Sequence, residues 1–211
     1  AGMAAYDARS KGHVTPVRDQ GGCGSCWAFG TLAAYETNYL KVNGGAANAL
    51  NLSEQQILSC SGGGDCGGGM SNLVYQWWVD GNNSVVTEAT YPYSSSATAC
   101  QPKPATNYKA EAWGLADPAA TYAGIASVAK IKEAICKYGS VASSVMVDGL
   151  FQNYVAGVFV GFNSNYGAPS SNHVVQIIGW DDAKGAWLIK NSWGTDWGMG
   201  GLMWIKYNAN N

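Results

Sequence analysis

The stretch GGCGSCWAFG, residues 21–30, holds two cysteines three positions apart, set among glycines and followed at once by apolar residues. Cys23 and Cys26 allow three interpretations: a redox pair, half of a metal site, or one structural cysteine beside one reactive cysteine. The apolar run from Ser25 to about Asn43 predicts a buried helix that begins at this motif, with Ser25 as its N-cap. The motif therefore places a cysteine at the first turn of a buried helix.

The composition argues against nucleic-acid and membrane partners. The chain has 211 residues, of which 12% are charged, and a formal net charge of -2 at pH 7. That charge, with a pI near 5.6, gives no general attraction to nucleic acid or anionic lipid. No apolar run approaches the roughly 20 residues of a membrane helix. The length suits one large domain or two small lobes that share a core.

The cysteine content favours an oxidising compartment. Six cysteines in a chain of this length fit secretion better than the cytosol. Two glycosylation sequons, Asn51-Leu52-Ser53 and Asn82-Asn83-Ser84, point the same way, although such motifs often match by chance. No basic-then-apolar signal segment opens the chain, so either none exists or this is the processed form of a longer precursor.

The first half of the chain is expected to be helical. After the helix at the cysteine motif, Ser53-Glu54-Gln55-Gln56 forms a capping box that opens a second, short helix. A third helix is predicted from Ser71 to Val79, where apolar side chains recur at spacings of three and four. Glycine-rich loops join these helices.

The second half changes to strands, interrupted by one helix from about Ser127 to Tyr138. The strands are predicted from β-branched and aromatic runs between turn residues, at Ser140–Val147, Gly157–Phe162, His173–Trp180, Ala186–Lys190 and Leu202–Tyr207. Residues 181–185 are expected to form a hairpin loop. Helices followed by antiparallel strands predict an α+β protein with two packed lobes, and a cleft between lobes commonly holds a substrate.

Redox and zinc chemistry are the weaker interpretations of the cysteine pair. Redox motifs of this spacing normally lie in a βαβ unit, and no βαβ pattern surrounds Cys23 and Cys26. A structural zinc site needs four ligands. Cys60 and Cys66 could complete the set, but their spacing of six is not that of a usual second pair. We expect no metal and no cofactor.

Nucleophilic catalysis needs a cysteine, a histidine and a group that orients the histidine. The chain has only two histidines. His13 follows a turn with no polar cluster around it, which favours a solvated surface histidine. His173 opens an apolar strand, and Asn191 lies in Lys190-Asn191-Ser192-Trp193-Gly194, where its amide can bond to an imidazole. The sequence therefore contains the cysteine, the histidine and the orienting group that nucleophilic catalysis needs.

Five motifs, in order along the chain, resemble the papain-like cysteine peptidases of the cathepsin L and papain type. They are Gln20–Phe29, Leu52-Ser53-Glu54-Gln55, Cys66-Gly67-Gly68-Gly69, Asn172-His173 and Asn191–Gly198. The match runs from about Lys11 to Lys206. His173 follows Cys26 by 147 residues, and Asn191 follows Cys26 by 165 residues. In the papain type, the histidine and asparagine lie roughly 130–150 residues after the cysteine.

The resemblance implies a papain-like two-lobed fold in a single unit that spans residues 1–211. A helical left lobe would cover about 12–113, and an antiparallel β-barrel-like right lobe would cover about 1–11 and 114–211, with the active-site cleft between them. The resemblance also implies disulfides Cys23–Cys66 and Cys60–Cys100. Cys136 is left over, and we expect an inert, half-buried thiol, with an intermolecular bond or an oxidation-prone thiol as the alternative.

The resemblance assigns the catalytic roles. Cys26 would be the nucleophile, with a low pKa from the helix end and from protonated His173. Asn191 would orient the imidazole under the cover of Trp193, and the Gln20 side chain would help to bind the oxyanion. Ser192 is expected to be only a polar neighbour.

Substrate contacts are carried over from the same resemblance. Gly69 would pair with the substrate backbone, the carbonyl of Asn172 would accept a substrate N–H, and uncharged walls would favour an apolar residue two positions before the cut. The full set of expected substrate-binding residues is Gly68, Gly69, Met70, Ser71, Ser143, Asn172, Val174 and Trp193.

The expected partners follow from the family. They are polypeptide substrates, an N-terminal propeptide removed from an inactive zymogen, and protein inhibitors of papain-like enzymes. The enzyme is expected to be a monomeric endopeptidase, secreted or held in an acidic lysosome- or vacuole-like compartment. The alternatives are a non-catalytic papain-like binding protein and, less in keeping with the motifs, a redox or zinc protein.

Overall fold

The computed structural model describes residues 2–121, 124–161 and 171–209. Its helices are α1 (Cys26–Asn43), α2 (Glu54–Cys60), α3 (Ser71–Val79), α4 (Val128–Tyr138) and the one-turn α5 (Gly149–Gln152), with 3-10 turns η1 (Ala8–Lys11) and η2 (Ala47–Ala49). Its strands are β1 (Ala5–Asp7), β2 (Gly64–Asp65), β3 (Gly68–Gly69), β4 (Val141–Val145), β5 (Val158–Phe159), β6 (His173–Asp181), β7 (Ala186–Lys190) and β8 (Leu202–Lys206).

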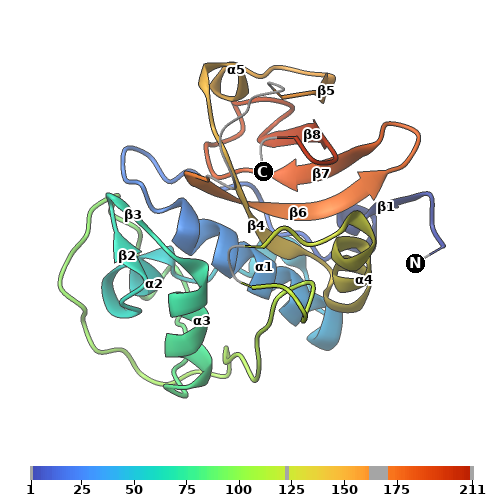
Figure 1. Ribbon diagram of the computed structural model, residues 1–211. Coiled ribbons are helices and arrows are strands. Elements are labelled where there is room, and N and C mark those ends of the chain that lie inside the picture. The colour runs from blue at the N-terminus through green and yellow to red at the C-terminus, as the bar shows by residue number, and fades with distance from the viewer. Residues whose placement is uncertain (1, 122–123, 162–170, 210–211) are drawn as a thin grey trace.

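The two lobes separate by type of secondary structure. Helices α1, α2 and α3 gather on one side of the molecule, and the main sheet lies on the other, with α4 beside it (Figure 1). We call these the helical lobe and the sheet lobe. This arrangement confirms the α+β two-lobed fold predicted from the sequence. No helix among the described residues is both long and apolar enough to cross a membrane.

The helix α1 begins at the cysteine motif, as predicted, but Ser25 does not cap it through its side chain. The Ser25 hydroxyl, which is fully buried, lies 2.6 Å from the hydroxyl of Tyr93. Because that hydroxyl is engaged elsewhere, the first N–H groups of α1 are left without a capping side chain.

The second helix shows half of the predicted capping box. The Ser53 hydroxyl accepts from the backbone N–H of Gln56 at 3.0 Å. The Gln56 side chain does not return to Ser53. Its oxygen accepts from the N–H of Val86 at 2.7 Å and its nitrogen donates to the carbonyl of Ser84 at 3.1 Å. A tertiary partner has replaced the local one.

The main sheet has the strand order β1-β6-β7-β8-β5, and β4 pairs with the other part of β6. All neighbours are antiparallel except β5 and β8, which are parallel. Among the described strands, the path from β1 to β5 does not close on itself. In the part of the chain that the structure describes, the lobe that was expected to be barrel-like is a mostly antiparallel sheet without closure.

Several predicted strands are shorter in the structure. The prediction at Ser140–Val147 narrows to β4, and that at Gly157–Phe162 narrows to β5, with residue 162 outside the described residues. Strand β7 has its predicted bounds, and residues 182–185 turn between β6 and β7 as expected. Strand length is limited by the partners available, since β5 pairs only at Trp204 and Ile205.

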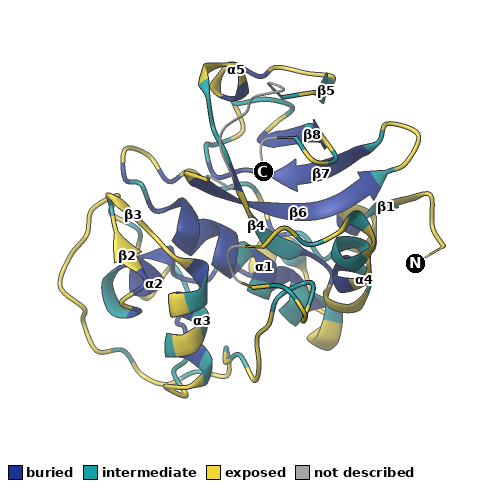
Figure 2. Ribbon diagram, in the orientation of Figure 1, coloured by how far each residue is buried: buried dark blue, intermediate teal, exposed yellow. Residues whose placement is uncertain are grey.

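Each lobe has its own apolar core. Buried residues concentrate along α1 and across β6, β7 and β8 (Figure 2). Strand β6 contributes side chains to both cores, because successive side chains of a strand point to opposite faces of the sheet. Val174 packs with the core of the helical lobe, whereas Val175 packs with that of the sheet lobe. Val14 and Val17 pack against the sheet core, so the segment after Gly12 is not confined to the helical lobe.

The lobes meet where α1 crosses β6. Gly30 of α1 lies so close to Val174 that a Cβ added at Gly30 would be 2.6 Å from the Val174 Cγ1 atom. One turn further along, the Gln176 side chain donates to the carbonyl of Ala33 at 2.9 Å and contacts the hydroxyl of Thr37 at 2.8 Å. This contact fixes the start of β6 against the start of α1.

Candidate active site

The two cysteines of the opening motif have different states. Cys23 forms a disulfide with Cys66, whereas Cys26 is a free thiol with 8% of its surface exposed. The turn between them packs closely, since a Cβ at Gly24 would lie 2.5 Å from the carbonyl oxygen of Cys66. The Gly24 N–H donates to that same carbonyl at 2.9 Å. The two cysteines therefore do not form a redox pair with each other.

Both disulfides predicted from the resemblance are confirmed. The second joins Cys60 to Cys100, which are 40 residues apart. Because Cys23, Cys60 and Cys66 are all in disulfides, none of them is available as a zinc ligand. Among the described residues, no cluster of three or more His, Cys, Asp or Glu side chains could hold a metal ion.

The histidine of the expected site lies at the start of β6. The His173 Nε2 atom is 2.7 Å from the Asn191 Oδ1 atom, and both residues are buried. The Asn191 oxygen also accepts from the backbone N–H of Ser192 at 2.8 Å, which fixes the direction of the amide. The Trp193 ring lies 4.8 Å from the imidazole, centroid to centroid. The imidazole of His173 thus lies against both the Asn191 amide and the Trp193 ring.

Cys26 lies beside this histidine strand. Val174, the residue after His173, packs in the same apolar core as Cys26. The backbone N–H groups of Val174, Trp27 and Cys26 favour the charged form of the Cys26 thiol. Nε2 of His173 is bound to Asn191, so Nδ1 is the ring nitrogen that remains for another partner.

Burial dominates the electrostatics of both groups. It raises the pKa of the Cys26 thiol, and the three N–H groups oppose it with smaller effects. Burial also lowers the pKa of His173, against a smaller opposing effect of the hydrogen bond to Asn191. Because desolvation of the sulfur is the larger effect, the N–H groups of α1 by themselves do not lower the pKa of this thiol.

Gln20 is held in position by contacts from both lobes. Its Nε2 atom donates to the carbonyl of Cys23 at 3.0 Å, and its Oε1 atom accepts from the Ser192 hydroxyl at 2.8 Å. An amide nitrogen has two hydrogens, so one N–H of Gln20 remains for a ligand. The expectation that Ser192 is only a polar neighbour is wrong, because it orients this amide.

Tyr93 was not identified from the sequence. Its hydroxyl donates to the carbonyl of Gln20 at 2.8 Å and meets the Ser25 hydroxyl at 2.6 Å. Ser95 donates to the same Gln20 carbonyl at 3.1 Å. Both residues lie in a loop with no regular spacing, about 70 residues from their partners, so no local pattern in the sequence marks them.

The glycines expected to bind substrate form an exposed edge above α1. Gly68 and Gly69 make up β3, which pairs with β2. A Cβ at Gly69 would lie 2.5 Å from the Trp27 ring, so a side chain there would collide with the helix. Met70 follows with 44% of its surface exposed, and Ser71 is buried at the start of α3.

Strand register changes one of the expected pocket residues. Ser143 pairs with Val175, and Ser144 pairs with Val174. Paired residues of antiparallel strands point to the same face. Val175 belongs to the core of the sheet lobe, whereas Val174 faces the helical lobe. Ser144, which is exposed, therefore shares the face of Val174, and Ser143 faces the opposite side.

The loop before His173 is clamped by Asn172. Its side-chain oxygen accepts from the N–H of Val147 at 2.7 Å, and its side-chain nitrogen donates to the carbonyl of the same residue at 3.0 Å. Asn172 itself is exposed. His13, the other histidine, is half-buried rather than solvated, and its Nδ1 atom has no hydrogen-bond partner among the described residues.

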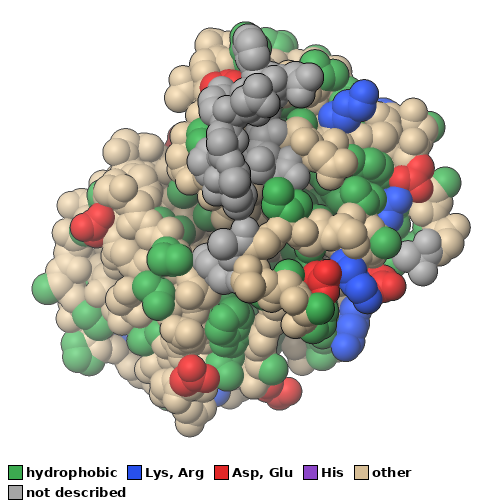
Figure 3. All heavy atoms as spheres, viewed as in Figure 1, with side chains coloured by type: hydrophobic (Ala, Val, Ile, Leu, Met, Phe, Trp, Pro, Cys, Tyr) green, Lys and Arg blue, Asp and Glu red, His purple; other side chains and the backbone are tan. Residues whose placement is uncertain are grey.

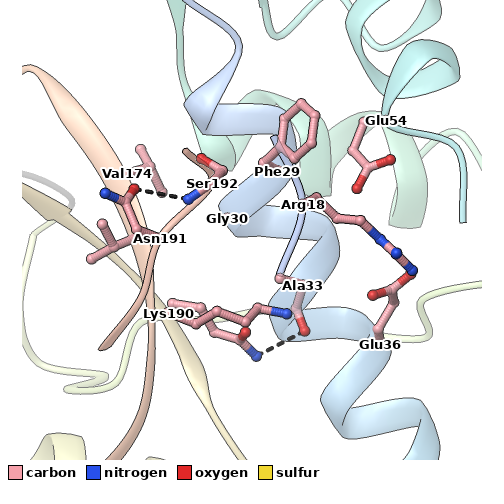
Figure 4. A pocket seen from close by; sticks show the side chains of 12 residues that line it. Arg18, Phe29, Gly30, Ala33, Glu36, Glu54, Val174, Lys190, Asn191 and Ser192 are labelled. Atoms are coloured by element: carbon pink, nitrogen blue, oxygen red, sulfur yellow. Dashed lines mark hydrogen bonds between the residues drawn. The ribbon is translucent and has the colours of Figure 1, made fainter. Parts of the chain in front are cut away.

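A small cavity lies between the lobes, behind Asn191 and Ser192 (Figure 4). Its volume of about 20 Å³ suits a water molecule and not a peptide. Charged side chains line it: in Figure 4, Arg18 lies between Glu54 and Glu36. Charged side chains are otherwise sparse on the face drawn in Figure 3, in keeping with a chain of which 12% is charged.

Comparisons with known proteins agree with this geometry. A sequence profile of the family described as papain family cysteine protease matches residues 3–211. Cysteine proteinase 1 of Entamoeba histolytica is 34% identical over 211 residues, which is 98% of this chain. Among solved structures, a Carica candamarcensis cysteine protease in complex with E-64 has a TM-score of 0.79 and 33% identity, covering 99% of this chain and 91% of that one.

A second solved structure is that of digestive procathepsin L2 proteinase from the Tenebrio molitor larval midgut. It has a TM-score of 0.82 and 31% identity, and the match covers 99% of this chain and 64% of that one. The chain likewise spans 60–64% of the length of Cysteine proteinase 1 and the other curated relatives that it matches. The profile match extends over nearly the whole chain, and so the chain belongs to the papain family of cysteine proteases.

Proposed function

We propose that this chain is a cysteine endopeptidase in which Cys26 is the nucleophile and His173 is the acid and base. The proposal rests on two observations: Cys26 is a free, buried thiol at the start of α1, and His173, bound to Asn191 at 2.7 Å, precedes Val174, which shares the apolar core of Cys26. Cys26 and His173 come from different lobes. Membership of the papain family supports the same assignment.

In the proposed reaction, the Cys26 sulfur attacks the carbonyl carbon of a peptide bond. The proton that it gives up is held on Nδ1 of His173 and passes to the leaving amine as the C–N bond breaks. The acyl group is then joined to sulfur as a thioester. A water molecule gives a proton to His173 and attacks the thioester carbonyl, which releases the acid and restores the thiol and imidazole.

The oxyanion of each tetrahedral intermediate needs donors already in place. The free N–H of the Gln20 side chain and the backbone N–H of Cys26 are the proposed donors. One such donor is typically worth about 3–4 kcal/mol of the barrier. Ser192 and Cys23 hold the Gln20 amide before substrate arrives, so little reorganisation is needed at the moment of reaction.

The thiolate and imidazolium are proposed to form together. Each ion alone is disfavoured by burial, as the directions of both pKa values show. Transfer of the proton from sulfur to Nδ1 creates two opposite charges side by side, whose attraction offsets both desolvation costs. Activity is therefore expected to rise as this pair forms and to fall at alkaline pH as the imidazolium loses its proton.

The substrates are proposed to be polypeptides with an apolar residue two positions before the cut. In this proposal Met70 and Val174 supply apolar side chains to the pocket, Ser71 adds a small one, and Ser144, which shares the face of Val174, joins Ser143 as a candidate. The backbone edge at Gly68 and Gly69, with the carbonyl of Asn172, would hold the substrate main chain, and Trp193 would border its far side. None of these side chains is charged, so a basic or acidic preference is not expected.

The remaining expectations stay proposals. The lobe boundaries near residues 12 and 113, a monomeric state, a propeptide and protein inhibitors are carried over from the family. One of the similar solved structures holds E-64, and another is a procathepsin. Two disulfides fit a secreted or lysosome-like location.

The test is labelling with a thiol-reactive epoxide peptide, followed by mass mapping of the modified residue. We expect modification at Cys26, lost in Cys26→Ala and strongly slowed in His173→Ala. Cys136→Ala is the matched control, because it removes the other free cysteine and should label as the parent does. Equal labelling of both cysteines, or binding of peptides without cleavage, would favour the non-catalytic binding protein.

Cleavage of both long and end-blocked peptides would distinguish an endopeptidase from an exopeptidase.

A further inference from the structure

A buried ammonium group lies next to the expected catalytic residues. Lys190, the last residue of β7, has 6% of its surface exposed and directly precedes Asn191. Its Nζ atom donates to the carbonyl of Thr15 at 2.9 Å and to the Thr15 hydroxyl at 3.2 Å. In the described part of the chain no carboxylate lies within ion-pair distance of it. Burying a charge without a direct counterion is costly, so a compensating arrangement is needed.

Thr15 provides that arrangement by connecting Lys190 to a buried carboxylate. The Thr15 hydroxyl donates to the Glu36 Oε2 atom at 2.6 Å. The other carboxylate oxygen of Glu36 accepts from the N–H of Leu52 at 2.9 Å. The result is a buried relay from Lys190 in the sheet lobe, through Thr15, to Glu36 on α1 in the helical lobe. Figure 4 shows Lys190 reaching from its strand toward α1.

The relay stands at one end of a seam formed by residues 15–20 and 190–194. At the other end, the Gln20 N–H donates to the carbonyl of Ser192 at 2.9 Å, and the Ser192 hydroxyl donates to the Gln20 side chain at 2.8 Å. The Gly194 N–H donates to the carbonyl of Arg18 at 3.0 Å, so residues 18–20 pair antiparallel with residues 192–194, and Thr15 and Lys190 meet outside this pairing. Residues 15–20 therefore end in Gln20, the proposed oxyanion donor, and residues 190–194 include Asn191.

From this placement we infer that Lys190 is a positioning residue for the proposed peptidase reaction. By fastening the end of β7 to Thr15, it ties the residue before Asn191 to the segment that leads to Gln20. Loss of this tie would loosen the seam at its Asn191 end, which would displace the imidazole relative to Cys26, the oxyanion donor, or both. This inference rests on the proposed function and adds to it a residue that does not touch the substrate.

The charges that face Lys190 come from three parts of the helical lobe. They are Glu36 on α1, Glu54 on α2 and Arg18 in the segment before α1. Burial lowers the pKa of Lys190 to about 8, with Glu36 opposing this and Arg18 adding to it. Burial raises the pKa of Glu36. Arg18 also faces Glu36, so Lys190→Met does not leave that carboxylate without a cation nearby.

The experiment compares Lys190→Met with Lys190→Arg and with Lys206→Met, a matched control at the exposed end of β8. Folding is checked by circular dichroism, kcat and KM are measured separately, and iodoacetamide alkylation of Cys26 is followed against pH. For Lys190→Met we expect kcat to fall about 10–100-fold, as for a displacement near 1 Å, with KM within about twofold. Lys190→Arg should recover part of kcat, and Lys206→Met should match the parent.

The alkylation profile locates the effect. If kcat falls and the pH dependence of alkylation changes, the displaced group is the His173–Asn191 pair. If kcat falls and the pH dependence is unchanged, the displaced group is Gln20. Both results support the inference. A folded Lys190→Met with parental kcat, or with only KM changed, overturns it. If Lys190→Met does not fold, Thr15→Val decides: it should lose about tenfold in kcat, the equivalent of one charge-assisted hydrogen bond, and Thr15→Ser should not. An inactive, unlabelled parent would instead refute the proposed function.

Discussion

Gly30 offers a direct test of how the two lobes are held together at the site. It lies within α1, where glycine is about 1 kcal/mol less favourable than alanine. A Cβ at this position would be 2.6 Å from the Cγ1 atom of Val174, about 0.8 Å short of the 3.4 Å at which ordinary contact begins. Val174 is β-branched and stiff, so β6 must shift if Gly30 becomes alanine.

The magnitude follows from two opposing effects. Overpacking of this kind costs about 1–3 kcal/mol, and the helix gains about 1 kcal/mol from alanine. Gly30→Ala should therefore lose about 0–2 kcal/mol of unfolding free energy. The shift also moves His173, the residue before Val174, so kcat should fall about 10–100-fold, as expected for a displacement near 1 Å.

A double-mutant cycle with Val174→Ala makes the prediction decisive. Shortening Val174 opens the space that the new Cβ needs, so the double variant should be about 1–3 kcal/mol more stable than the sum of the single changes. Stability is measured by urea denaturation in a Cys26→Ala background, which prevents self-digestion, and kcat is measured with Cys26 intact. Gly149→Ala is the control, since nothing lies within 4 Å of its added Cβ. Additivity within about 0.5 kcal/mol would refute the steric reasoning.

Three further predictions follow from other contacts. Burial raises the pKa of Glu54 from 4.5 to about 8, so the folded chain holds a proton that the unfolded chain releases, and stability falls as pH rises between these values. Glu54→Gln should therefore be more stable than the parent at pH 7 by about 1–3 kcal/mol, and the gain should vanish below pH 4.5 in thermal denaturation. Replacing both Cys60 and Cys100 by alanine opens a loop of 40 residues and should cost about 4 kcal/mol in the chain-entropy account; a loss below 1 kcal/mol in urea denaturation would contradict that account. Expressed through a eukaryotic secretory pathway, the chain should carry a glycan at exposed Asn82 and none at Asn51, whose two following residues are fully buried, as peptide mass mapping would show.

The sequence predicted the helices well because apolar spacing and helix starts depend on residues that are close to one another along the chain. Apolar spacing gave α3 its bounds, and the cysteine motif gave the start of α1. The nucleophile, the histidine and the asparagine came from motifs that recur in a known order. Both disulfides came from the same resemblance, because cysteine spacing alone leaves the pairing open.

Tertiary partners account for the errors. The hydroxyl of Ser25 could cap α1, but Tyr93 lies 68 residues away and takes it. The Gln56 side chain could return to Ser53, but Val86 offers a buried N–H. The face to which Ser143 points could not be predicted either, because it depends on the pairing of β4 with β6 and not on β4 alone. In the cases of Ser25 and Gln56, a partner distant in the sequence outcompeted a local one.

The contacts that the sequence could not indicate are those that cross the lobes. Lys190 and Thr15 are 175 residues apart, and Ser192 and Gln20 are 172 apart. Lysine at the end of a strand ordinarily predicts an exposed cation. Its burial becomes visible only when Thr15 and Glu36 are placed beside it.

Comparing magnitudes shows which group must make the Cys26 sulfur reactive. A helix end is worth about 0.3–1 kcal/mol to a nearby charge, and up to about 2 in partly buried geometry. The structure shows that the N–H groups at the start of α1 do not overcome burial of the sulfur. A full opposite charge at about 4 Å contributes about 4 kcal/mol at the effective dielectric of such sites. In the proposed reaction, the imidazolium of His173 would therefore make the larger contribution, and its position depends on Asn191, to which it is bound. The proposal makes reactivity depend on how the lobes are joined, because the helix would supply the sulfur and the sheet would supply the charge that ionises it.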